Sequence, residues 1–307
     1  MGPRCWLALL MFTATGAAQS IPLTLRVDGW DRTARIVIPT NRPGPLPAVL
    51  ILHGAGGSGA GYLEKNGWER QALTSGFIAI APDGLPSQPQ LPAAFRTNPR
   101  LWNSGQLREG SPRAGIDDLR YFAALIDAVA DRHPLDRRRI YATGHSNGGA
   151  MAWRIAAENA DHFAAVAPVC GLMAVELPRP IRGIPVWAIS GALDPLQPLA
   201  GGESHLPWGN RTTPPVRAGV ARFAVGLGCP MAPKQDSDQW PGLDTLVWGP
   251  GRDGALLRWS VIQGHGHAWP GGQDSGLPAS LLGPSTSTLE ATPAIWAFFS
   301  AHRLSER

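Results

Sequence analysis

The residues best suited to do chemistry lie in the segment Gly144–Gly148 (GHSNG), between an apolar run and a helical stretch. Gly-x-Ser-x-Gly is typical of a serine nucleophile where it joins a strand to a helix. The glycines permit a tight, strained turn, because a larger side chain would clash with the neighbouring strand or helix. The helix that follows favours negative charge in front of the serine. We therefore expect Ser146 to be the nucleophile of an acyl-transfer reaction.

A glycine-rich turn, His53–Ser58 (HGAGGS), directly follows another apolar run. Acyl transfer develops negative charge on a carbonyl oxygen, and two fixed backbone N–H groups can stabilise that charge as an oxyanion hole. The residue after the nucleophile, Asn147, is expected to supply one N–H. The glycine-rich turn is expected to supply the other, from Ala55 or, as the alternative, from Gly56.

A serine nucleophile needs a base, and the chain order Ser, acid, His places that base after Ser146. Two histidines, His265 and His267, lie in a loop directly after the predicted strand 256–262, where an imidazole can reach the serine hydroxyl. Residue types and order do not separate these two. The other histidines after the nucleophile are less well placed: His162, His205 and His302.

The acid must hold the imidazole in its useful tautomer and stabilise the imidazolium ion. Asp194 is the preferred candidate because it follows the apolar run 185–189 in a short loop. Asp236, Asp238 and Asp244 are rivals in a less regular segment.

Unbroken apolar runs at 48–52, 77–81, 140–143, 164–167 and 185–189 predict strands that are buried on both faces. Segments with helical spacing lie between or after these runs, and they include 116–130, 148–158 and the segment from 292 onwards. This alternation predicts a single α/β domain with a mostly parallel sheet flanked by helices. Residues 21–39 alternate as an opening hairpin, whereas 201–215 and 269–287 are expected to be loops that border the site.

The N-terminus has the pattern of a signal peptide, with Arg4, an apolar core at 6–12 and small residues at 16–18. We expect a signal at 1–18, a catalytic domain at 19–307 and secretion. The apolar core is too short to span a membrane, so we expect no membrane partner after the signal is removed. Export to an oxidising compartment would allow Cys170 and Cys229 to pair, although sequence does not determine whether they do.

The composition argues against several function classes. The net charge is only +4 and the arginines are scattered, whereas nucleic-acid binders usually present a dense basic face. The pair His265 and His267 lacks the cysteine or carboxylate spacing that would complete a metal site. We therefore expect no nucleic acid, metal or cofactor. The expected partner is a small-molecule or polymer ester substrate, and the oligomeric state is not indicated.

Taken together, these motifs resemble the secreted esterase and polyhydroxybutyrate depolymerase family, which is related to feruloyl and acetylxylan esterases and has the α/β-hydrolase fold. The most specific segments are 139–151 (RIYATGHSNGGAM) and 264–271 (GHGHAWPG). The resemblance implies that His267 is the base, and it supports Asp194 as the acid. It also implies that Trp102 and Trp269 line the substrate cleft, the alternative being that both are packing residues.

The chain departs from the family pattern at one position that concerns its cysteines. Many relatives carry a cysteine shortly before the strand that leads to the base, whereas this chain has Trp248–Gly251 there, which leaves Cys229 without that partner.

The sequence thus predicts a secreted carboxylic-ester hydrolase that works through an acyl-enzyme on polyhydroxybutyrate-type, feruloyl or acetyl polysaccharide esters. A serine peptidase or amidase of the same fold, or a non-catalytic binding relative, is the alternative.

Overall fold

The computed structural model describes residues 18–40, 42–107, 110–207, 209–236, 241–273 and 275–305. The expected signal segment therefore lies outside the described residues up to position 17, as does the rival acid Asp238. Within the described ranges, none of the helices has both the length and the apolar character needed to cross a membrane.

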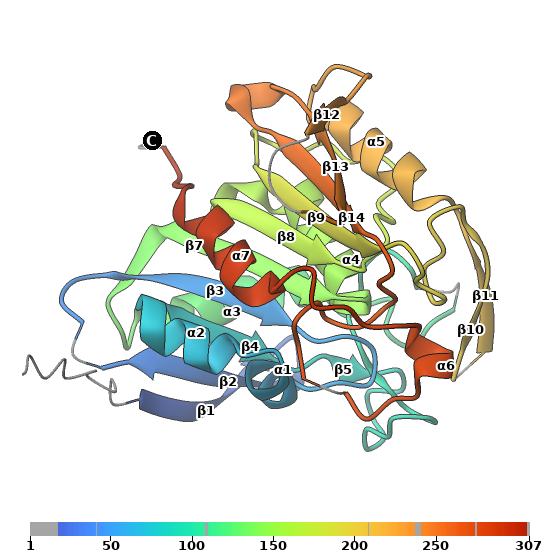
Figure 1. The fold of residues 1–307 in the computed structure, drawn as a ribbon. Helices are drawn as coiled ribbons and strands as arrows, with labels where there is room; N and C mark the ends of the chain where they lie inside the picture. Colours follow the sequence, from blue (N-terminus) through green and yellow to red (C-terminus); the bar gives the residue numbers. More distant parts are fainter. Residues whose placement is uncertain are drawn as a thin grey trace, which may run out of the picture.

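A ten-stranded sheet forms the centre of the protein, in the order β1-β2-β4-β3-β7-β8-β9-β14-β13-β12 (Figure 1). The pairs from β4 through β3, β7, β8 and β9 to β14 are parallel, and the strands outside them pair antiparallel. The strand bounds are β1 Ala18–Val27, β2 Trp30–Pro39, β3 Leu46–Leu52, β4 Ile78–Pro82, β7 Leu135–His145, β8 Ala165–Val169, β9 Val186–Gly191, β12 Lys234–Asp236, β13 Leu243–Trp248 and β14 Leu257–Ile262.

Helices cover both faces of this sheet, which is why β3, β4 and β8 are apolar along their whole length. Along β3, Leu50 faces the core that contains side chains of α3, α4 and α5, whereas Val49 and Ile51 face the core that contains side chains of α1, α2 and α7. The helix bounds are α1 Gly59–Lys65, α2 Trp68–Ser75, α3 Asp118–Ala130, α4 Asn147–Glu158, α5 Val216–Gly226, α6 Ala279–Leu282 and α7 Ala291–Ser300, with 3-10 turns at Ala160–His162 and Arg252–Gly254. The single α/β domain predicted from the apolar runs is confirmed.

The two segments expected to be loops contain some regular structure. The segment 201–215 forms an antiparallel hairpin of β10 (Gly202–Leu206) and β11 (Gly209–Thr213), and 269–287 contains α6. Most residues of the hairpin are exposed, so its sequence has no apolar alternation that would predict strands. A second short hairpin joins β5 (Leu85–Pro86) to β6 (Arg100–Leu101).

The parallel strands all end at one edge of the sheet, which we call the carboxyl edge. At this edge the glycine-rich turn follows β3, and Ser146 follows β7. Asp194 lies after β9, and His267 lies after β14. In sheets of this kind, ligands bind outside the carboxyl ends of the strands. The fold therefore collects the sequence candidates at one place.

Candidate active site

Ser146 occupies the sharp turn between β7 and α4, with φ 56° and ψ −118°. This positive φ is strained for a residue that has a Cβ atom. The turn is possible because a Cβ on Gly144 would overlap the carbonyl of Gly148, and a Cβ on Gly148 would overlap the carbonyl of Leu52. The structure thus bears out the steric reason for both glycines, and it leaves the Ser146 side chain only partly buried.

His267 lies between Ser146 and Asp194. Its Nε2 is 2.8 Å from Ser146 Oγ, and its Nδ1 is 2.6 Å from Asp194 Oδ2. A carboxylate only accepts, so Nδ1–H donates to Asp194 and Nε2 is left to accept from the serine hydroxyl. This tautomer is the one that a base acting on Ser146 requires.

Asp194 is buried and held from both of its oxygens. Its Oδ1 accepts from the backbone N–H groups of Leu196 (2.9 Å) and Gln197 (2.8 Å). Burial alone would raise the pKa of this carboxyl, but His267 and the two N–H groups outweigh burial and lower it below its usual value. Asp194 is therefore ionised at neutral pH. The two other described candidates for the acid bind side chains away from His267: Asp236 pairs with Arg258, and Asp244 accepts from Gln263.

The neighbouring histidine, His265, has a different environment. Its Nδ1 accepts from the backbone N–H of Thr286 at 3.0 Å, so its Nε2–H donates to the carbonyl of Ala268 at 3.0 Å. Burial lowers the pKa of His265. Both ring nitrogens of His265 thus bind the backbone of its own loop and of Thr286. The hydrogen bonds therefore distinguish His265 from His267, whose ring nitrogens face Asp194 and Ser146.

The two candidate donors in the glycine-rich turn, Ala55 and Gly56, differ in their backbone hydrogen bonds. The N–H of Gly56 donates to Arg100 O at 2.8 Å, and that of Gly57 donates to Gly54 O at 3.0 Å. The N–H groups of Ala55 and Asn147 have no hydrogen-bond acceptor among the described residues. This difference favours Ala55 over Gly56 as the second donor.

The two tryptophans expected to line the substrate cleft are packing residues. Trp102 is 1% exposed, and its Nε1–H donates to His53 O at 2.9 Å. Trp269 is 6% exposed, and its Nε1–H donates to Thr292 Oγ1 at 3.1 Å. Indole rings that are desolvated and bonded in this way have almost no surface left for a ligand. Burial therefore favours the packing alternative over the cleft-lining expectation.

Cys170 and Cys229 are both free thiols. Cys170 directly follows β8 at the carboxyl edge, whereas Cys229 packs against Gly251 near the start of β14, at the opposite edge. A five-residue strand is roughly 16 Å long, and a disulfide needs Cα atoms less than about 7 Å apart. The disulfide that sequence left open is therefore not formed.

The sequence reasoning did not place three side chains near Ser146: His145, Tyr62 and Cys170. The Nε2–H of His145 donates to the backbone carbonyl of His267 at 2.6 Å, and the Tyr62 hydroxyl lies 2.7 Å from His145 Nδ1. Only the position of His145 inside the Gly-x-Ser-x-Gly segment was a signal, and it did not indicate partners more than 80 residues away.

The thiol of Cys170 lies beside the acid and the base. The ligand atoms of Cys170, Asp194 and His267 all lie within 4.8 Å of one another. Among the described residues, this is the group of side chains that could share a metal ion. A thiol binds metal as the thiolate, and burial together with the Asp194 charge raises the pKa of Cys170 well above its usual value. The hydrogen-bonded arrangement of Asp194 and His267 is therefore the one that the local chemistry favours.

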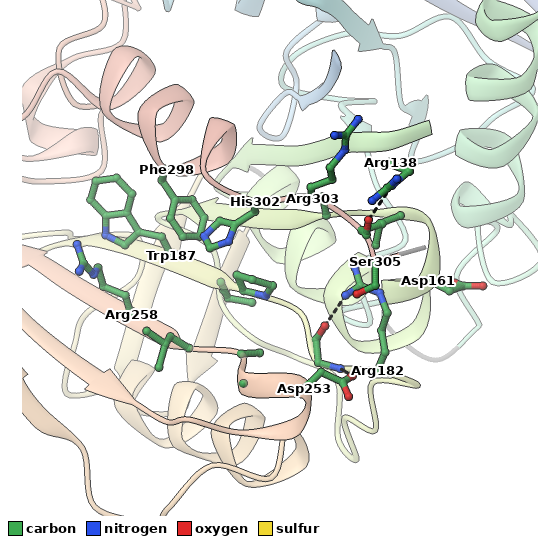
Figure 2. A pocket seen from close by; sticks show the side chains of 18 of the residues that line it. Arg138, Asp161, Arg182, Trp187, Asp253, Arg258, Phe298, His302, Arg303 and Ser305 are labelled. Atoms are coloured by element: carbon green, nitrogen blue, oxygen red, sulfur yellow. Dashed lines mark hydrogen bonds between the residues drawn. The ribbon is translucent and has the colours of Figure 1, made fainter. Parts of the chain in front are cut away.

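A cavity of about 1040 Å³ lies at the edge opposite to Ser146, among the starts of β8, β9 and β14 and the end of α7 (Figure 2). Arginines line it, together with Trp187 and Phe298. Among its arginines, Arg258 is paired with Asp236 and Arg303 with Asp136. Ser146, His267 and Asp194 lie at the carboxyl edge and not in this cavity.

The doubly covered, mostly parallel sheet defines the protein as an α/β-hydrolase. More particularly, the chain belongs to the dienelactone hydrolase family, whose model matches residues 33–201 and so covers more than half of it. The matched segment includes Ser146 and Asp194, and it ends before His267.

Named relatives agree with this assignment. A putative esterase, NocK, of Nocardia uniformis subsp. tsuyamanensis is 33% identical over 170 residues, which cover 52% of this chain and 43% of the relative. A feruloyl esterase B of Piromyces equi is 26% identical over 72% of this chain and 39% of the relative. The chain thus spans less than half the length of these relatives.

Among solved structures, an acetyl xylan esterase from Aspergillus awamori matches with a TM-score of 0.55 at 17% identity, over 82% of this chain and 94% of that chain. This likeness supports the fold. Together with the sequence relatives, it confirms the resemblance to feruloyl and acetylxylan esterases that the motifs indicated.

Proposed function

We propose that this protein is a secreted serine esterase in which Ser146, His267 and Asp194 form the catalytic triad. The observation that carries the proposal is the continuous hydrogen-bonded chain from Asp194 through His267 to Ser146, with distances of 2.6 and 2.8 Å. The chain ends on a partly exposed hydroxyl at a strained turn in front of a helix N-terminus. Such a nucleophile and base, oriented by a third group, are the requirement for covalent catalysis.

In the proposed reaction, Ser146 Oγ attacks the ester carbonyl carbon while its proton passes to His267 Nε2. Asp194, ionised and fixed by two N–H groups, stabilises the resulting imidazolium. The backbone N–H groups of Ala55 and Asn147 receive the oxyanion. His267 then protonates the leaving alcohol. A water molecule, deprotonated by the same base, releases the acid from the acyl-enzyme.

The proposed substrates are feruloyl or acetyl esters of polysaccharides and polyhydroxybutyrate-type esters. The segments 139–151 and 264–271 support these classes, as do the names of the related esterases. The proposal of secretion rests on the signal pattern at 1–18.

A panel of chromogenic acetyl and feruloyl esters and hydroxybutyrate oligomers, with a peptide p-nitroanilide added, tests the proposal. We expect ester turnover in the wild type and a loss of about 10⁶-fold in kcat for Ser146→Ala. Ser300→Ala is the matched control, because Ser300 is an exposed residue at the end of α7. Ester turnover that survives Ser146→Ala would contradict the mechanism, and turnover of the anilide alone would indicate a peptidase.

A further inference from the structure

We propose that His145 and Tyr62 are positioning residues that hold the nucleophile turn, the base loop and the oxyanion turn at their working distances. This inference rests on the proposed function, since it assigns roles relative to Ser146 and His267. It concerns two side chains that the esterase mechanism does not itself use.

The first contact joins the nucleophile turn to the base loop. His145 immediately precedes Ser146, and its Nε2 lies 2.6 Å from the backbone oxygen of His267. A carbonyl oxygen only accepts, so Nε2 must carry the proton. One side chain therefore fixes the main chain of the base relative to the nucleophile, across 122 positions of sequence.

The second contact fixes the tautomer of His145. With the proton on Nε2, Nδ1 is an acceptor, and it receives the Tyr62 hydroxyl hydrogen at 2.7 Å. If Tyr62 did not donate there, the proton could move to Nδ1, and the Nε2 lone pair would then face the His267 carbonyl. The α1 helix, which carries Tyr62, thus controls a bond at the base loop.

The third contact reaches the oxyanion turn. A Cβ atom on Gly54 would lie 2.9 Å from Tyr62 Oη, 3.3 Å from Ser146 Cβ and 3.4 Å from His145 Nδ1. The residue before Ala55 therefore packs directly on the Tyr62–His145 pair. All three segments that must meet around the reacting carbonyl touch these two side chains.

The electrostatics of His145 suit this role. Burial and the neighbouring His267 lower the pKa of His145 to about 3. His145 therefore stays neutral when His267, with ring centroids 5.0 Å apart, takes up a proton during turnover. The bond to the base loop is consequently kept in both protonation states of the base.

Four variants test the inference in the full-length enzyme. His145→Leu removes the donor, whereas His145→Gln retains an amide N–H near the position of Nε2. Tyr62→Phe removes only the hydroxyl, and its matched control is Tyr121→Phe, a buried tyrosine that bonds Thr33 O away from the site. The measurements are kcat and KM for a small ester, the rate of fluorophosphonate labelling of Ser146, and thermal unfolding.

We expect His145→Leu to lose about 100-fold in kcat and in labelling rate with little change in KM, because displacements of about 1 Å at a reacting centre have that effect. His145→Gln should recover most of the rate, Tyr62→Phe should lose an intermediate amount, and Tyr121→Phe should match the wild type. Folded His145→Leu protein with wild-type kcat and labelling would overturn the inference. So would a failure of His145→Gln to recover activity.

If His145→Leu does not fold, Tyr62→Phe decides, and unchanged labelling in that variant overturns the inference. Labelling also separates this result from the proposed function. A wild type that labels at Ser146 but cleaves no ester contradicts the esterase assignment, and the labelling rates of the variants still test the positioning role.

Discussion

The charged side chains at the two edges of the central sheet differ in what they bind. At the edge opposite to Ser146, the arginines that line the cavity bind carboxylates or backbone carbonyls, as in Arg258 with Asp236 and Arg138 with Leu304 O. At the carboxyl edge, the carboxylate of Asp194 meets an imidazole, and that imidazole meets a hydroxyl. The contacts at the first edge join fixed charges to carboxylates and carbonyls, whereas at the second edge the proton of the Ser146 hydroxyl can pass to His267.

The volume of a cavity is a poor guide to chemistry in this protein. The cavity in Figure 2 is large, but its Arg258 is paired with Asp236 and its Arg303 with Asp136. The reactive hydroxyl lies on a tightly packed turn whose glycines have no room for a Cβ atom. Strain and unfinished hydrogen bonding, as at the N–H groups of Ala55 and Asn147, mark the carboxyl edge as the reactive one.

The largest expected effect is on turnover. Asp194→Asn should lower kcat by about 10⁴-fold, because the amide can no longer hold His267 in the tautomer that accepts from Ser146. Asp127→Asn is the matched control, since Asp127 is an exposed carboxylate that pairs with Arg137. Steady-state kinetics on a chromogenic ester measure both. Equal losses of kcat in the two variants would contradict the proposed role of Asp194.

Acid should destabilise the protein through two buried histidines, His53 and His145. Burial lowers the pKa of His53 to about 4, and burial with the nearby His267 lowers that of His145 to about 3. Between pH 6.5 and about 4 the unfolded chain binds these protons while the folded chain does not, so stability is full above pH 6.5 and falls as the pH falls. One pKa unit corresponds to about 1.4 kcal/mol, so the loss is several kcal/mol in size.

Urea unfolding between pH 7.5 and 4 measures this dependence. His145→Gln should flatten the curve, because it removes one of the two groups. A curve of unchanged slope in this variant would show that His145 is protonated in the folded state.

A smaller effect is expected from packing at the nucleophile turn. Gly148→Ala should lower the free energy of unfolding by about 3 kcal/mol, because the added methyl overlaps the carbonyls of Leu52 and His53. Gly115→Ala is the control, since a Cβ there meets nothing within 4 Å. Denaturant unfolding gives both values. Two equally stable variants would mean that the turn is not as tightly packed as the structure shows.

The smallest effect is expected from the cysteines, which lie one at each edge of the sheet. Dithiothreitol should leave the melting temperature unchanged, because Cys170 and Cys229 are free. Cys170 should not react with a thiol reagent in the folded protein, since burial raises its pKa. Differential scanning fluorimetry and a thiol titration measure these outcomes. A drop in melting temperature on reduction would show that the two are bridged.

Much of the fold was predictable because its signals are local. The unbroken apolar runs indicated strands covered on both faces, and β3, β4, β8 and β9 are buried throughout. The β10–β11 hairpin was not predictable, because its mostly exposed residues carry no apolar period. The role of Trp102 and Trp269 was not predictable, because an aromatic residue beside a motif can pack or bind a ligand, and burial favours packing here.

The sequence by itself determined the turn that carries Ser146. Its glycines, the apolar run before them and the helix after them are neighbours in the chain, so the local pattern alone predicts the sharp turn there. Only the tertiary structure decided which histidine faces that turn. His265 and His267 are two residues apart with the same chemistry, and they differ in what the folded chain brings to their ring nitrogens. Thr286 and Ala268 hold the first, and Asp194 and Ser146 meet the second.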